Sequence, residues 1–92
     1  MEGVQPKLSD PELAAAYLNA ALQEDSTEEF LLALRSVADV HGGLGTVAEA
    51  AQLNRQTLYR TLSSNGNPTL DTLLSLLRVM GLNLAFIPAT SS

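Results

Sequence analysis

The sequence has no cysteine, no tryptophan, one histidine and only four aromatic residues in 92 positions. Without cysteine it has no disulfide framework and no thiolate zinc site, and one histidine is too few for a metal site built from imidazoles. No apolar run approaches the roughly 18 residues that a membrane span needs. The first ten residues contain one lysine and no apolar segment, so they do not read as a signal peptide. We therefore expect a soluble, cytoplasmic protein with no metal and no cofactor.

Basic residues are also scarce: five lysines and arginines stand against ten acids, for a net charge of −5. This balance argues at first against a nucleic-acid partner. The charge is unevenly spread, however, because residues 1–50 sum to −7 and residues 51–92 to +2. Several acids fall where helices are expected to start, which the helix dipole favours. The alternative is that the two halves present surfaces to different partners.

Cap residues and apolar spacing predict five helices. Asp10-Pro11 starts the first, which runs to about residue 23 with an inward stripe. A capping box at Ser26 to Glu29 starts the second, and Gly42-Gly43 stops it. The inward stripe of the first helix is expected to be Leu13, Ala16, Tyr17, Ala20 and Ala21.

The second half continues this pattern with three shorter helices. We expect a helix over 46–51, another over 55–63 that is capped by Asn54, and a last one that is capped by Thr69 and stops at Gly81. Residues 82–87 alternate in a way that indicates a strand, which needs a partner such as a second copy of the chain.

The predicted fold is all-α, a five-helix bundle that contains a helix-turn-helix and has a short C-terminal strand for dimerisation. A chain of 92 residues is expected to form a single domain. Within it, 1–9 is a flexible arm, 10–42 an N-terminal helical leader, 43–81 the helix-turn-helix core, 82–87 the strand and 88–92 a tail.

The two short helices joined by a tight turn carry the functional signal. Their inward positions are expected to be Val47, Ala48, Ala51, Leu53, Leu58 and Leu62. Helical spacing places Arg55, Gln56, Tyr59, Arg60 and Ser63 on the outward side. Glutamine pairs with adenine and arginine with guanine in a major groove, so this side suits DNA reading. An ordinary solvated helix face would look the same from spacing alone.

Residues 43–84 resemble the Cro/C1-type (Xre-type) helix-turn-helix domain. The matching stretches are TVAEAAQLNRQTLYRTLS and NGNPTLDTLLSLLRVMGLNL, including the family's Pro-Thr-Leu pattern before a helix that ends at Gly81. The leader DPELAAAYLNAAL, followed in order by these stretches, resembles the addiction-module antidote proteins, or Hig-type antitoxins, over about residues 10–87. Gln52 departs from the glycine of many such turns, and Thr61 stands where an apolar residue is usual.

This resemblance implies a DNA-binding antitoxin of a type II toxin–antitoxin module. Such proteins neutralise a small basic toxin of the RelE/ParE type and repress their own operon as homodimers on double-stranded operator DNA. By position, the implied base-contacting residues are Arg55, Gln56, Thr57, Tyr59 and Arg60. The implied phosphate-contacting residues are Thr46, Asn54, Ser63, Asn65 and Asn67. There are two alternatives to the antitoxin function: a stand-alone phage-type transcriptional repressor, and a protein-interaction module without DNA binding.

Nothing in the sequence predicts catalysis or RNA binding. Ser63-Ser64 lacks a neighbouring base, and His41 sits where a helix C-terminus favours a cation. The aromatic residues are scattered, and Phe30 and Phe86 are expected to be buried rather than to stack on bases. We therefore expect no catalytic residues and no enzymatic activity.

Overall fold

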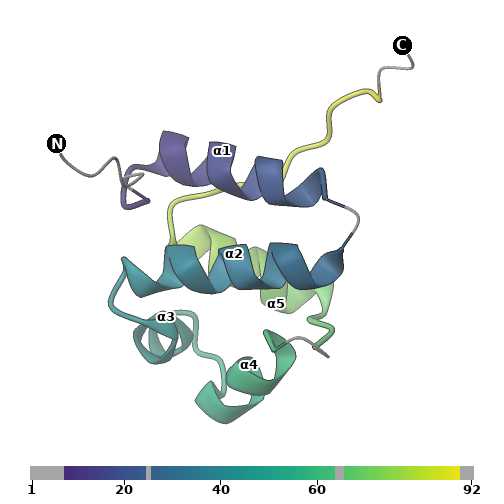
Figure 1. The fold of residues 1–92 in the computed structure, drawn as a ribbon. Helices are drawn as coiled ribbons and strands as arrows, with labels where there is room; N and C mark the ends of the chain where they lie inside the picture. The colour runs from purple at the N-terminus through teal and green to yellow at the C-terminus, as the bar shows by residue number, and fades with distance from the viewer. Residues whose placement is uncertain (1–7, 25, 64–65, 90–92) are drawn as a thin grey trace, which may run out of the picture.

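A computed structural model describes residues 8–24, 26–63 and 66–89, and these form five helices and no strand. The helices are α1 (Pro11–Leu22), α2 (Thr27–Asp39), α3 (Leu44–Ala50), α4 (Arg55–Thr61) and α5 (Leu70–Val79). α1 and α2 run antiparallel, and α3 and α4 lie at the end of the molecule away from α1 (Figure 1). The prediction of an all-α fold with five helices is confirmed.

Side-chain caps start four of the five helices where the sequence predicts them. The Asp10 carboxylate accepts a hydrogen bond from the Glu12 amide at 2.9 Å, and the Asn54 side chain accepts one from the Thr57 amide at 2.8 Å. Ser26 and Thr69 cap α2 and α5 in the same way. Each bond satisfies an amide that the first helical turn leaves without an intrahelical partner.

The start of α3 differs from the prediction. Residue 46 was expected to be first, but α3 begins at Leu44, directly after Gly43, whose carbonyl accepts from the Val47 amide at 3.1 Å. The cause is packing, because both Leu44 and Gly45 are buried and the extra residues extend the inward face of the helix. Apolar spacing from Val47 onward gave no sign of this extension.

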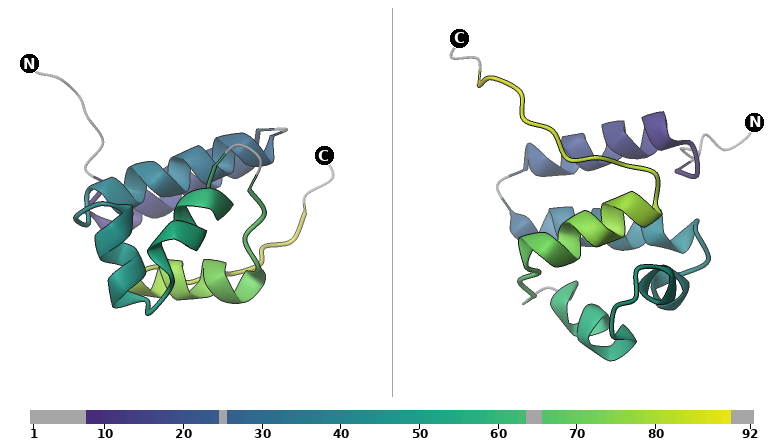
Figure 2. Two further views of the ribbon diagram at one scale, coloured as in Figure 1. Left: turned by 90° about the horizontal axis from the view of Figure 1, so that it is seen from below. Right: turned by 180° about the vertical axis from the view of Figure 1, so that it is seen from behind.

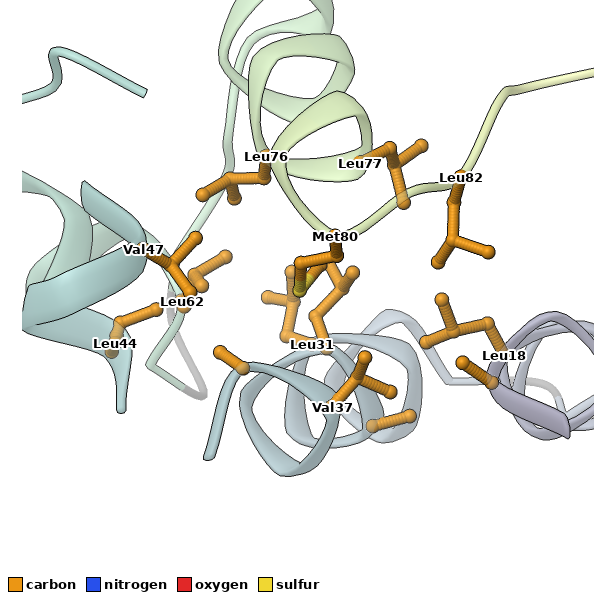
Figure 3. Packing of buried hydrophobic residues seen from close by; sticks show 14 of the residues in the cluster. Leu18, Leu31, Val37, Leu44, Val47, Leu62, Leu76, Leu77, Met80 and Leu82 are labelled. Atoms are coloured by element: carbon orange, nitrogen blue, oxygen red, sulfur yellow. The ribbon is translucent and has the colours of Figure 1, made fainter. Parts of the chain in front are cut away.

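The core is built mainly from leucines of α2, α4 and α5 and the small residues of α3. Leu31, Leu34 and Val37 of α2 are almost fully enclosed, as are Leu62 and Leu76. Figure 3 shows Leu31 of α2, Leu62 and Leu76 of α5 pointing toward one another in the middle of this cluster.

The predicted inward face of α1 is wrong in most of its members. Ala14 and Leu18 are the buried residues of α1, Tyr17 and Ala21 pack against the core at its edge, and Leu13 is exposed. Ala16 and Ala20 are exposed as well. α1 is apolar on nearly every side, so its sequence offers little contrast from which to identify the packed face.

Three of the expectations concern the ends of the chain. Leu8 is buried, but residues 1–7 and 90–92 lie outside the described part, so the flexible arm over 1–9 and the tail over 88–92 stay predictions. Residues 82–87 form no strand in the single chain, so strand pairing with a second copy stays a prediction. Phe86 was expected to be buried and is 93% exposed.

Within 8–24, 26–63 and 66–89, no helix has the length and apolar character to cross a membrane. In the same ranges, no group of three histidine, cysteine or acidic side chains is placed to hold a metal ion.

Candidate nucleic-acid interface

α3, the following turn and α4 form a helix-turn-helix whose inward residues hold the two short helices together. Val47, Ala48, Leu58 and Leu62 are buried, and Leu53 packs at the edge of the core. Ala48 is small where α3 is enclosed by its neighbours, since α3 packs against α2, α4 and α5. Viewed from below in Figure 2, α3 and α4 lie side by side in front of the other helices. The inward positions that the sequence predicted are thus at least partly buried.

The turn between α3 and α4 is closed by the hydrogen bonds of a Schellman motif. The Leu53 amide donates to the Ala48 carbonyl at 2.8 Å, and the Gln52 amide donates to the Glu49 carbonyl at 3.1 Å. Gln52 adopts a left-handed conformation with φ of 59°. α2 and α5 end in the same way, but with glycine (Gly42 and Gly81) at the left-handed position. A side chain in this conformation costs about 1 kcal/mol or more, so Gln52 stores strain at the turn.

The outward side of α4 is polar and open to solvent. Gln56, Thr57 and Arg60 are exposed, whereas Leu58 is the one buried residue of the helix. Thr61 is half-buried and donates its hydroxyl hydrogen to the Thr57 carbonyl at 2.5 Å. Leu62 takes the buried place instead. At Thr61, where an apolar residue is usual, the adjacent Leu62 therefore supplies the buried side chain.

Arg55 begins α4 and lies back across α3. A Cβ atom placed on Gly45 would come within 2.7 Å of the Arg55 Nε atom, so the guanidinium group occupies the space that a larger residue at this position would fill. Glu49 and Leu53 line the same shallow hollow. Arg55 is exposed, but in this conformation its guanidinium rests against the first turn of α3 rather than extending from α4 with Gln56.

Tyr59 has a partner that the sequence did not indicate. Its ring is 43% exposed, and the guanidinium carbon of Arg35, from α2, lies 5.9 Å from the ring centroid. This distance is within reach of a cation–π attraction of about 0.5–1 kcal/mol. Arg35 therefore adds a third positive charge beside α4. The sequence gives no sign of this pairing, because Arg35 and Tyr59 are 24 positions apart and meet only in the folded chain.

The predicted phosphate-contacting residues are spread around the helix ends. Thr46 is exposed on α3, and Asn67 is exposed before α5. The side-chain oxygen of Asn54 accepts the hydrogen bond that caps α4. Ser63 is half-buried, and its hydroxyl donates to the Arg60 carbonyl at 2.7 Å. Asn65 lies outside the described residues.

The electrostatic character of this surface differs from that of the whole chain. α4 contains two arginines and no acid, and Arg35 lies against it. In the described ranges no polar or charged side chain is buried, so these groups lie at the surface rather than in a pocket. The arrangement can place one glutamine, one threonine and arginines in a groove of suitable width, which is the chemistry of base and phosphate recognition.

Comparison with known proteins places the chain in a family. It is 35% identical over 79 residues to an uncharacterized protein of Haemophilus influenzae (strain ATCC 51907 / DSM 11121 / KW20 / Rd), an alignment that covers 86% of this chain and 80% of the relative. No solved structure matches it significantly. Residues 3–88 match the family described as "Probable addiction module antidote protein". The chain therefore belongs to the family of probable addiction module antidote proteins, which supports an antitoxin role in a toxin–antitoxin module.

Proposed function

We propose that the protein neutralises a small basic toxin of the RelE/ParE type and, as a homodimer, represses its own operon through the α3–α4 helix-turn-helix. The observation that carries the DNA half is the outward side of α4, where Gln56, Thr57 and Arg60 are exposed together without an acidic neighbour on the helix. In a dimer, two copies of α4 would enter major grooves about 34–36 Å apart on a palindromic site.

The toxin half of the proposal rests on family membership and on charge. The chain is strongly acidic in residues 1–50, and Glu12, Glu24, Glu28 and Glu29 are exposed around α1 and α2. A surface of this sign attracts a basic protein and accelerates its association. α4 lies away from α1, so binding of a toxin to the α1–α2 side would leave α4 free (Figure 1).

Expression of the neighbouring reading frame tests the toxin half. If that frame encodes a small basic toxin, its expression alone should stop growth, and co-expression with this chain should restore growth and yield a complex of the two proteins. The matched control is the same experiment with the partner frame carrying an early stop codon. A neighbouring protein that is harmless alone, or that remains toxic in the presence of this chain, would leave the stand-alone repressor as the better explanation.

A footprint of the DNA upstream of the gene tests the repressor half. We expect a protected palindromic site, with binding that weakens as salt rises. A dimer brings six arginines from residues 51–92 and two copies of Arg35 beside α4, so the slope of log K against log salt should be no steeper than about −7. No protection, with or without the toxin, would support a protein-interaction module that does not bind DNA.

A further inference from the structure

The chain beyond α5 leaves the body of the protein with its apolar side chains uncovered. Residues 83–89, here called the C-terminal arm, cross α1 and then project away from it (Figures 1 and 2). Phe86 is 93% exposed and Ile87 is 84% exposed, and Leu84 is exposed as well. Removing large apolar side chains from water is favourable, so the C-terminal arm is stabilised when another surface covers Phe86 and Ile87.

The backbone of the C-terminal arm is also without partners. The Leu82 amide donates to the Leu77 carbonyl at 2.7 Å, and in the described residues no hydrogen bond follows along 83–89. An extended row of free amide and carbonyl groups is a template for pairing with another strand. Pro88 limits the length of such a pairing, because it has no amide hydrogen to donate.

An apolar groove lies directly beside the C-terminal arm. Leu18 and Leu22 of α1, Phe30 of α2 and Leu77 of α5 line it, together with Leu84 and Ile87 of the arm itself. No charged side chain lines the groove, and residues 79–92 contain no charged residue. The groove and the arm therefore form one continuous uncharged surface on a protein of net charge −5.

We infer that this surface binds a second copy of the chain. The two C-terminal arms pair as an antiparallel ribbon around a two-fold axis, and Phe86 of each copy covers the groove of the other. A two-fold contact requires the inserting group and its receptor to lie on the same surface, and the arm and groove meet that condition. Two copies that each carry −5 repel one another, so they meet best where neither is charged. A basic protein partner would find no acidic side chain on this surface to attract it.

The location of this interface leaves the helix-turn-helix accessible. The C-terminal arm leaves the molecule beside α1, whereas α4 lies at the opposite end (Figures 1 and 2). The homodimer is part of the proposed function, but the arm pairing depends on neither DNA nor toxin. Its failure is therefore distinguishable from failure of operator binding or toxin neutralisation.

The test measures the mass of the isolated full-length protein by analytical ultracentrifugation over a range of concentrations, together with amide hydrogen exchange. The wild-type chain should be dimeric, with protected amides in residues 83–87. Phe86→Glu should raise the dimer dissociation constant by at least about tenfold and abolish the protection, because it places a charge in the apolar contact. Thermal unfolding should stay cooperative, since Phe86 is solvent-exposed in the single chain.

Leu32→Glu is the matched control, because Leu32 is also exposed but lies on α2 and does not line the groove. It should leave the dimer unchanged. A monomeric wild-type protein, a dimer that tolerates Phe86→Glu, or a dimer with unprotected arm amides would overturn the inference. A monomer whose binding to the toxin is lost with Phe86→Glu would also overturn it, and would assign the surface to the toxin.

Discussion

Replacing Gln56 by alanine should weaken binding to the operator by about 1–3 kcal/mol, or roughly 5- to 150-fold, with little effect on non-specific DNA. Gln56 is exposed near the start of α4, and among the described residues its side chain makes no hydrogen bond. Its side-chain amide is therefore free to pair with an adenine. Arg60→Ala should give a loss of similar size. The measurement is a titration of labelled operator DNA at one fixed salt concentration, with a scrambled duplex in parallel.

The controls come from the same residue types elsewhere on the surface. Gln23→Ala changes an exposed glutamine at the end of α1, and Arg78→Ala changes an exposed arginine on α5. Gln23→Ala should bind like the wild type. If Arg78 contacts a phosphate, Arg78→Ala should lower the salt slope by about 1 and weaken specific and non-specific binding alike. Equal operator affinity of Gln56→Ala, Arg60→Ala and the wild type would remove α4 from base recognition.

Arg55 shows where prediction from sequence stops at this site. Spacing alone places Arg55 beside Gln56 on α4, and it is exposed as expected. Its guanidinium nevertheless lies over Gly45, because a glycine in α3 leaves room for it. Likewise, Arg35 reaches Tyr59 from a helix that the motif does not include. The direction of a long side chain depends on the neighbours that the fold supplies, and helical periodicity contains no information about them.

Local rules succeeded at the helix boundaries because capping acts over a few residues. Asp10, Asn54 and Thr69 cap the helices they were predicted to cap, and Gly81 takes the left-handed position after α5. Burial was harder to predict where it depends on distant partners. Apolar spacing places Leu70 on one stripe with Leu73, Leu74 and Leu77, but Leu70 is exposed at the first turn of α5. Phe86 is exposed because nothing in the described part of the single chain covers the C-terminal arm.

Leu58→Ala should cost about 2–5 kcal/mol of the free energy of unfolding, which is the range for truncating an enclosed leucine. Leu58 is 1% exposed and is the one buried residue of α4. The helix has seven residues, too few to be stable in water without packing, so its attachment depends on Leu58 and on Leu62 immediately after it. Urea denaturation followed by circular dichroism measures the loss.

Two further substitutions test whether the loss of stability is specific to the buried Leu58 side chain or follows from any truncation in α4. Leu58→Met keeps most of the apolar volume and should cost less than about 1.5 kcal/mol. Tyr59→Ala removes a larger side chain that is 43% exposed, and it should cost less than Leu58→Ala despite the lost contact with Arg35. A loss below about 1 kcal/mol for Leu58→Ala would mean that α4 is held by other contacts. The expected loss is a large fraction of the roughly 5–15 kcal/mol that stabilises a domain. Leu58→Ala should therefore abolish operator binding by releasing α4, although it changes none of the DNA-facing side chains themselves.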